Sequence, residues 1–414
     1  MNRKPLGIYL PKFIVTALLL VAVSSEVFSQ KKPVFTNADT LINQKDIVDY
    51  LKPFFIKDTV KYNQRRKGIS DKRVYFSLLP STTGVPGGGA ALVTSTNISF
   101  YMGDRKKTTL SELYFTPYTN FQGKYVFPLR SNIWLNGNSW NLLGDLRFLI
   151  YPQKSWGLGS NTVEDNATLI NYNYFRFYET ALKKIAPNIF AGFGINFDHH
   201  SSINAQANQG FFESLKPHYD TLNATSYSTG YNLTLQFDSR KFTNNPLGGM
   251  FVSASFRTNP SFLNKTGSWN QWIFDARKYY SFSKIRQNVL AFWAYHWRVG
   301  GEYIPYLDLP STAWDPYART SRGFYQGRYR SDKHWYFEGE YRRDITKNGL
   351  LGFVLFANIS SFSDFKTSNF ARWNSAAGGG IRLKLNKFSR TNIVLDYAFS
   401  KGYQTYYLNI GETF

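Results

Sequence analysis

A pair of adjacent histidines beside a carboxylate is the first feature of this chain whose residue types could do chemistry. Asp198, His199 and His200 are ligands that suit transition metals. Successive side chains of a strand point to opposite faces, however, so the two imidazoles cannot both reach one ion from this segment. The chain has 5 histidines and no cysteine, which excludes disulfides and thiolate ligands. We therefore predict no metal site.

Two glycine runs have the flexibility to cradle a phosphate group. Gly87 to Gly89 and Gly378 to Gly380 lack the Lys-Ser/Thr pair and the helix of a phosphate loop, so we interpret both as places where a sheet curves. The sequence also has no Gly-x-Ser-x-Gly elbow and no spaced carboxylate pair. We predict neither an enzyme nor a cofactor; a catalytic barrel is the alternative, with no residue constellation to support it.

Ion pairing in a confined space is the chemistry that the sequence does support. Residues 334–346 alternate so that Glu338, Glu340 and Arg342 share one face of a predicted strand. Arg322, upstream of this strand, could reach Glu338 or Glu340 and form a charge-assisted, bidentate bond. Such a bond requires a loop that turns inward toward the strand.

The tip of that loop has residues suited to close packing. Gly323 lets the backbone approach a wall, and Phe324 can pack on Tyr336 or on another inward aromatic ring. Asn358 would face inward from the following strand. The alternative is a solvated, flexible loop, which is what most basic surface loops are.

Composition indicates which elements hold this loop. Aromatic residues make up 18% of the chain, while the mean hydropathy of -0.35 is too polar for a bundle of membrane helices. Together these values predict an all-β fold, a transmembrane antiparallel β-barrel. The long apolar stretch from Phe13 to Val23 follows basic residues and is shorter than the ~20 residues that span a bilayer. We interpret residues 1–29 as a signal peptide.

Alternation of apolar and polar residues locates the strands. Between Tyr231 and Phe237 the odd-numbered residues would face lipid, and Asn232, Thr234 and Gln236 would face the lumen. The same division puts further residues outside: Trp293, Tyr295, Trp297, Ile381, Leu383, Leu385, Ile393, Leu395, Tyr397, Phe399, Tyr406, Leu408 and Ile410. A soluble β-sandwich also alternates, but its apolar face seldom carries so many Trp and Tyr residues.

Runs of this kind predict about 16 strands over residues 73–414. Bacterial single-chain barrels have even strand numbers, so short turns such as 347–349 would be periplasmic. The longer polar connections 201–225 and 302–333 would be extracellular. A barrel this wide encloses more space than its own side chains fill, and the second connection is long enough to enter it.

Four segments of the chain carry a family resemblance. They are FDSRKFTNNPLG at 237–248, SRGFYQGRYRS at 321–331, HWYFEGEYRRDI at 334–345 and YLNIGETF at 407–414. In this order they resemble the Omp85 superfamily of assembly and translocation barrels, BamA/TamA-like proteins and D15-type surface antigens. The first segment matches the family's strand-end motif through Asp238, Arg240, Pro246 and Gly248, and the second matches its sixth extracellular loop through Arg-Gly-Phe.

The resemblance implies an outer-membrane barrel of a Gram-negative bacterium that acts in protein insertion or translocation or in membrane assembly. It implies that Arg322, Gly323 and Phe324 fold into the lumen. Many relatives carry Asp where this chain has Asn358, and Gly where it has Ser360. The arginine would lose one counter-charge, which leaves Glu338 and Glu340 as partners and predicts a looser lock.

The resemblance also assigns roles to the C-terminus. A terminal aromatic residue such as Phe414 is the family's signal to the barrel assembly machinery, so the protein would itself be a client of that machinery. Gly411 matches a glycine that kinks the closing strand and weakens its pairing with the first strand. An opened seam would expose unpaired backbone groups on which another chain can form a strand. The alternative is a glycine that merely ends the strand.

The segment ahead of the barrel is short for this family. Full-length relatives carry periplasmic POTRA domains there, whereas residues 30–72 cannot hold one such domain with a core. Residues 43–57 have helical apolar spacing, although Pro53 would kink or end the helix. We predict a short periplasmic segment and a form without POTRA domains, for which a separate periplasmic protein is a possible partner.

Net charge completes the partner predictions. The chain carries +22 at pH 7, with 49 Lys and Arg against 27 Asp and Glu, but no nucleic-acid-binding motif. Outer-membrane lipids and lipopolysaccharide phosphates are better partners. If Arg176, Arg298, Arg382 and Lys384 face the lumen, they would favour anions in a pore. The alternative function is therefore a passive anion-biased pore or a structural surface antigen.

Overall fold

The computed structural model of the protein describes residues 44–55, 74–84, 90–120, 123–206, 211, 213, 215, 224–240, 242–264, 267–283, 286–316 and 319–414. The predicted signal peptide at 1–29, Gly87 to Gly89 and most of the segment 30–72 lie outside these residues. All elements below belong to one unit, Asn43–Phe414.

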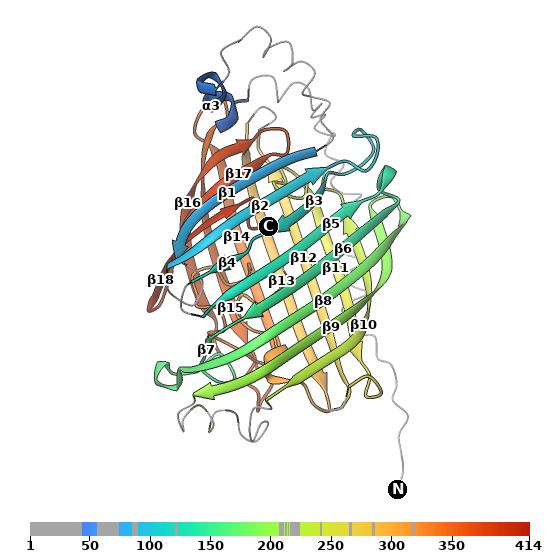
Figure 1. The fold of residues 1–414 in the computed structure, drawn as a ribbon, viewed down its shortest axis with the longest axis vertical. Helices are drawn as coiled ribbons and strands as arrows, with labels where there is room; N and C mark the ends of the chain where they lie inside the picture. Colours follow the sequence, from blue (N-terminus) through green and yellow to red (C-terminus); the bar gives the residue numbers. More distant parts are fainter. Residues whose placement is uncertain are drawn as a thin grey trace. The chain divides into compact units, whose positions relative to one another are not determined.

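Helix α3 (Ile47–Phe55) precedes a succession of strands (Figure 1). The first nine are β1 (Val74–Gly84), β2 (Ala90–Phe100), β3 (Ser111–Phe115), β4 (Tyr118–Thr119), β5 (Tyr125–Trp134), β6 (Trp140–Ile150), β7 (Gln153–Ser155), β8 (Thr168–Ala186) and β9 (Ile189–Gln206). The others are β10 (Ser226–Asp238), β11 (Gly249–Asn259), β12 (Trp269–Ser281), β13 (Asn288–Gly301), β14 (Lys333–Asp344), β15 (Leu351–Phe362), β16 (Asn374–Asn386), β17 (Thr391–Ser400) and β18 (Tyr403–Ile410). Three 3-10 turns lie between them: η1 (Asn136–Asn138), η2 (Glu164–Asn166) and η3 (Tyr306–Asp308).

The strands form a single antiparallel sheet in chain order. Two spans are interrupted, because β3 and β4 both pair with β2 and β5, and β6 and β7 both pair with β8. Pro117 and Pro152 lie at the interruptions, and proline has no backbone N–H to give to a ladder. The 18 strands of the sheet minus these two breaks leave 16 spans. The predicted all-β antiparallel fold of about 16 strands is confirmed.

The first and last strands meet without pairing. β1 and β18 lie close together, and within the described residues β1 pairs with β2 and β18 pairs with β17. No ladder between β1 and β18 occurs among these residues. We call this junction the seam. It leaves backbone groups on two neighbouring strand edges without ladder partners.

Most strands present apolar side chains outward and polar ones inward. Leu233 is 62% exposed and Ile381 is 56% exposed, whereas Asn232 and Arg382 are buried at 5% and 3%. The alternation predicted for β10 and β16 is thus confirmed. An apolar outer face around a polar interior is the arrangement of a transmembrane barrel of the outer-membrane type.

Strand β13 has the opposite orientation to the one predicted. Trp293 and Tyr295 are 1% exposed, whereas Arg298 is exposed on the other face and does not belong to the lumen. The indole N–H of Trp293 donates to Asp275 at 2.9 Å, and its ring lies 5.2 Å from that of Phe414. Aromatic side chains fit inside here because chain, rather than water, fills this part of the interior.

The chain that fills the interior is the connection between β13 and β14. Arg147 of β6 donates to the main-chain carbonyl of Pro316 in this connection at 2.5 Å. Arg330 donates to the carbonyl of Tyr306 at 2.7 Å, within the same connection. Trp314 lies buried against Tyr151, the residue that follows β6, with ring centroids 5.7 Å apart. The predicted inward turn of residues 302–333 is present, and we call this segment the lumen loop.

Helix α3 covers two turns at the end of the barrel near β14 to β17. The carboxylate of Asp46 accepts the backbone N–H of Asp49 at 2.9 Å, which caps the helix. Lys387, in the turn after β16, pairs with Asp49 at 2.8 Å. The helix lies within the predicted range 43–57 and continues past Pro53 to Phe55. Among the described residues no helix is long and apolar enough to cross a membrane.

Candidate functional site

The guanidinium of Arg322 is surrounded by three carboxylates inside the barrel. It lies 2.6 Å from Glu340 and 2.9 Å from Asp396, and it also pairs with Glu338. The ring centroid of Phe356 is 3.6 Å from the guanidinium carbon. Glu338 and Glu340 come from β14 and Asp396 from β17, so one loop residue joins two strands that are not neighbours. We call Arg322 and these carboxylates the arginine hub.

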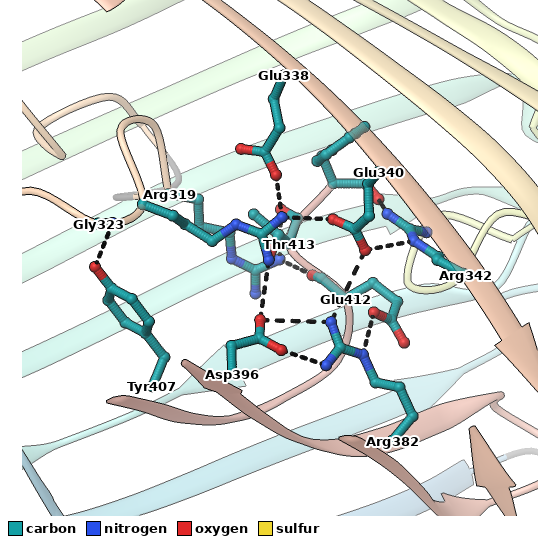
Figure 2. Close-up of polar contacts among 12 residues, drawn as sticks. Arg319, Gly323, Glu338, Glu340, Arg342, Arg382, Asp396, Tyr407, Glu412 and Thr413 are labelled. Atoms are coloured by element: carbon teal, nitrogen blue, oxygen red, sulfur yellow. Dashed lines mark hydrogen bonds and ion pairs between the residues drawn. The ribbon is translucent and has the colours of Figure 1, made fainter. Parts of the chain in front are cut away.

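A second layer of ion pairs extends the hub toward the C-terminus (Figure 2). Arg382 of β16 pairs with Asp396 and lies 2.8 Å from Glu412. Arg342 of β14 lies 2.8 Å from Glu340 and donates to the main-chain carbonyl of Phe414 at 2.7 Å. All of these side chains are buried. Removing one member would leave a buried charge unpaired, which typically costs 3–5 kcal/mol.

The loop tip makes the close approach that its glycine permits. Gly323 has a φ of 92°, and a Cβ atom there would lie 2.7 Å from the Cβ of Ala376. Its backbone N–H donates to the Tyr407 hydroxyl at 3.0 Å, and its carbonyl accepts from Ser400 at 2.6 Å. Tyr407 belongs to β18, so the tip touches a strand of the seam.

Phe324 packs on aromatic rings other than that of Tyr336, the ring named in the prediction. It is 6% exposed and lies in a cluster with Tyr329, Phe362 and Ala376. Its ring centroid is 6.0 Å from that of Tyr329, which is part of the same loop. Tyr336 instead packs against Trp293, at 5.2 Å. The side chain of Phe324 thus packs both on its own loop and on the barrel wall.

Asn358 binds the backbone of the loop tip and does not act on the arginine charge. Its side-chain amide donates to the main-chain carbonyl of Arg322 at 3.0 Å. The predicted loss of one counter-charge is wrong in its consequence, because Asp396 supplies a third carboxylate beside Glu338 and Glu340. Asp396 belongs to β17, which is not part of the four segments that resemble the family. This strand therefore supplies the counter-charge that Asn358 does not.

The strand-end motif lies at the start of a loop that reaches the C-terminus. Arg240 binds the Asp238 carboxylate with two bonds of 3.0 and 2.8 Å. Further along, Asn244 donates to Thr391 at 3.0 Å, and its side-chain oxygen accepts from Tyr114 at 3.0 Å. Pro246 is buried, and Gly248 has open space where a Cβ would be.

Gly411 links this loop to the end of β18. The strand ends at Ile410, and Gly411 has a φ of 85°. A Cβ there would lie 2.5 Å from the Asn244 side-chain oxygen, so the turn requires glycine. Gly411 therefore lies after the closing strand, not within it. Residues 411–414, which we call the tail, turn into the lumen, and Ile410 is buried instead of facing outward.

Phe414 is a buried interior residue. It is 3% exposed, and its ring lies 5.2 Å from Trp293 and 6.2 Å from Tyr279. Arg319 of the lumen loop donates to the main-chain carbonyls of Glu412 and Thr413. The tail is held between the lumen loop and the barrel wall.

Sequence reasoning missed Asp396, Glu412 and Arg319. Asp396 lies between outward residues of a predicted strand, which was a usable signal. The glycine run in β16 was another, because a Cβ at Gly380 would lie 1.9 Å from a carboxylate oxygen of Asp396. The run makes room for the hub, in addition to any effect on curvature. Nothing in the local pattern indicated that Glu412 or Arg319 would meet inside the barrel.

The histidine pair lies apart from the hub. Asp198 binds Arg257 at 2.7 Å and accepts from Tyr178 at 2.7 Å, while His200 stacks on Tyr174 at 4.2 Å. Within the described part of the chain, no group of three His, Cys, Asp or Glu side chains is placed to hold a metal ion.

Comparison with known proteins gives distant likenesses. No family model and no curated protein matches the chain. A solved structure of BamA from Haemophilus ducreyi lacking POTRA domains 1-3 is similar, with 11% identity over 84% of this chain and 77% of that chain and a TM-score of 0.49. CdiB from Acinetobacter baumannii has 11% identity over 82% of this chain and a TM-score of 0.49, and the match spans 60% of the CdiB chain, less than two thirds.

A third likeness is to OccK11 from Pseudomonas aeruginosa, with 9% identity over 82% of this chain and 90% of that chain and a TM-score of 0.34. The chain's own features are more specific than these values: an Arg-Gly-Phe tip inside a sixteen-span barrel, a following strand that supplies two of its three acids, and a seam without a ladder among the described residues. In its four segments and in where the fold places them, the chain resembles the Omp85 superfamily.

Proposed function

We propose that the protein is an Omp85-type outer-membrane barrel that acts in protein insertion or translocation or in outer-membrane assembly. The arginine hub carries this proposal, since it holds a loop inside the lumen beside a seam that has no ladder in the described part of the chain. A passive pore needs neither feature, because an inward loop obstructs flow and an unpaired seam weakens the wall.

The contacts of the lumen loop support a coupling between the lock and the seam. Arg322 binds Asp396 of β17, and Gly323 binds Tyr407 of β18. Arg319 binds the tail that follows β18. Displacement of the loop would therefore remove support from the closing strands. Freed strand edges could then template a strand of a client protein.

Partners of this activity are part of the proposal. The seam, which has no ladder among the described residues, would face the outer-membrane lipids, and lipopolysaccharide phosphates suit the chain's net charge of +22. A separate periplasmic protein would deliver clients, and α3 lies at the turns where such a protein would approach. The terminal Phe414 would mark the unfolded chain as a client of the barrel assembly machinery.

Single-channel recording in planar bilayers tests the proposal. The purified wild type should give rare, small openings, and Arg322→Ala should give large and frequent ones because the loop loses its anchor to three carboxylates. Arg343→Ala is the matched control, since Arg343 lies on β14, the strand of Glu338 and Glu340, with its side chain exposed on the outside. Steady large currents in all three proteins would contradict a plugged barrel.

A passive anion-biased pore is the second candidate, favoured by one observation. A cavity of about 250 Å³ remains in the lumen, and we call it the chamber. Its lining includes Arg130, Arg240, Arg257, Arg277 and Arg319. Wild-type currents that are steady and anion-selective, and unchanged by Arg322→Ala, would favour this candidate. A structural surface antigen would give no current in either protein.

A further inference from the structure

Two basic residues lie opposite one another on the outer wall of the barrel. Arg298 of β13 faces Lys333 of β14 directly in the antiparallel ladder. Both positions alternate with the buried inward residues of their strands, so the two side chains share the outer face. Arg298 is exposed and Lys333 is partly exposed. Like charges directly opposite each other destabilise a sheet, so this pair favours an anion between its two members.

The acids at the ends of these strands leave part of this charge uncompensated. Asp332 lies 3.8 Å from Lys333. Glu302, after β13, accepts a backbone N–H from the residue before β12 at 3.2 Å, and Asp364, after β15, accepts two backbone N–H groups of its own turn at 3.0 and 2.8 Å. In the part of the chain that the structure describes, Arg298 has neither a hydrogen bond nor an ion pair. One carboxylate, that of Asp332, therefore serves two cations.

A row of aromatic rings lies beside this pair on the same face. His296 is opposite Trp335 of β14 and Phe274 of β12, and its ring centroid lies 4.1 Å from the first ring and 6.3 Å from the second. Trp272 is opposite Arg298, and its ring is parallel to that of Phe274, with an interplanar angle of 2°. Indole and imidazole rings have an apolar body and a polar N–H group, so they suit the boundary between acyl chains and headgroups.

The two cations and the aromatic row form one surface, which we call the outer-wall site. Its members are Arg298, Lys333, Trp272, Phe274, His296 and Trp335. Both positive charges act on the His296 ring, so they meet at the same point of the wall. Further along this face Ala294 is opposite Phe337, which is 37% exposed. Charged, aromatic and apolar side chains thus follow one another along β13 and β14, in the order of the phosphate, the sugar and the acyl chains of a phosphorylated glycolipid.

The outer-wall site lies at the end of the barrel where the lumen loop begins. Strand β13 runs into this loop at Gly301, and β14 leaves it at Lys333. The turns that α3 contacts, after β14 and after β16, are at the other end of these strands. Short turns of outer-membrane barrels are periplasmic, so the site is at the level of the outer leaflet. The phosphate groups of that leaflet belong to lipopolysaccharide, whose lipid part carries them on a pair of sugars.

We propose that the outer-wall site binds a phosphate group of lipopolysaccharide between Arg298 and Lys333, with the phosphorylated sugar on the aromatic row. Arg298 offers a planar fork of N–H groups and Lys333 a compact charge, and both bind phosphate oxygens. The anion also relieves the repulsion between the two cations. The proposal assigns one place on the wall, which net charge alone does not, and it stands whether or not the barrel inserts proteins.

Native mass spectrometry tests the site with the full-length protein refolded into neutral detergent, so that it carries no cellular lipid. The probes are lipid A with both of its phosphates and, as the anionic competitor, phosphatidylglycerol. Arg298→Gln and Lys333→Gln should each weaken lipid A binding about tenfold, and Arg298→Lys should retain most of it. Arg343→Gln removes the same charge from the outer face at the other end of β14, and it should change binding less than about twofold.

Thermal unfolding of the same proteins gives a second readout with the opposite sign. Without lipid, Arg298→Gln should unfold at a higher temperature than the wild type, because the like charges no longer oppose each other. With lipid A, the wild type should gain more stability than this variant.

Three results would overturn the proposal. Lipid A retained equally by the wild type and by Arg298→Gln would show that the cations do not hold it. Equal losses in Arg343→Gln would show attraction to net charge alone, and phosphatidylglycerol retained as well as lipid A would place a phospholipid at the site. Heat-dependent gel mobility confirms that each variant has folded.

Discussion

Arg322 holds the lumen loop through acids that come from two places in the sequence. Glu338 and Glu340 follow the loop directly and share a face by alternation, so sequence predicted them. Asp396 lies 74 residues from Arg322, and its contribution depends on how β17 curves back toward β14. Alternation gives the face of a residue but not the residue that it meets across a lumen, and for this reason the third acid was missed.

Asn358→Asp, which introduces the acid typical of the superfamily that the chain resembles, should weaken the lock of this protein. Asn358 is directly opposite Glu338 in the β14–β15 ladder, where like charges repel. A carboxylate there could not donate to the Arg322 carbonyl as the amide does at 3.0 Å. We expect the loop to lose about 1–3 kcal/mol of stability, measured as faster trypsin cleavage within the lumen loop.

Asn358→Ala provides the control for this variant, since it removes the donor without adding charge. It should increase cleavage less than Asn358→Asp does. If the acid variant instead slows cleavage below the wild-type rate, a carboxylate at 358 strengthens the hub, and the assigned role of the amide is wrong.

At the scale of elements, strand positions could be read from the sequence, while the orientation of β13 and the inward side chain of Ile410 could not. The alternation in β10 and β16 gave the right faces because lipid on one side and water on the other impose it. The inward face of β13 packs against the lumen loop and the tail, and its outward face meets lipid. Both faces of the strand therefore have apolar surroundings. Periodicity alone cannot tell such faces apart, and the aromatic face was assigned to lipid.

The lumen loop carries a titratable anchor at η3. Asp308 accepts from Ser228 of β10 at 2.5 Å, and burial, together with the Asp198 carboxylate, raises the pKa of Asp308 to about 7. A raised pKa means that the folded state binds the proton more tightly than the unfolded state. The stability contributed by this proton is therefore complete below the ordinary pKa of 3.8 and is lost as the pH rises toward 7.

Asp308→Asn tests this anchor. The amide keeps an oxygen for Ser228 and has no proton to lose near neutrality. Urea unfolding in lipid vesicles, followed by tryptophan fluorescence, should show wild-type stability falling between pH 5 and pH 8 more steeply than that of the variant. Parallel pH profiles for the two proteins would show that Asp308 does not titrate in this range.

At the scale of the whole molecule, the interior is divided into a filled part and a hollow part. The hub and the tail lie beside β13 to β18 (Figure 2), whereas the lumen loop crosses the interior to β6 and β10. The chamber lies largely along β5 to β12 and is lined by amides, hydroxyls, arginines and carboxylates. Composition predicted a polar lumen but could not predict this division, which depends on where the lumen loop and the tail come to rest.

We expect the small residual current of the wild type to pass through the chamber. Ser255→Trp places a large ring in the chamber, since Ser255 is one of its lining residues. Phe256→Trp on the opposite face of the same strand is the control, because Phe256 packs against Trp272 at 4.5 Å. Single-channel recording should show the residual openings lost in Ser255→Trp and kept in Phe256→Trp. Unchanged openings in both would place the current elsewhere.

The buried tail has a consequence for the order in which the barrel is completed. Glu412 and Phe414 are at most 3% exposed in the folded barrel, and they follow β18, the strand at the seam. Glu412 supplies an acid for Arg382, and Phe414 supplies the ring that packs on Trp293. The segment that finishes the inside of the barrel is therefore tethered to its closing strand, so filling of the lumen and placement of β18 are coupled steps of folding.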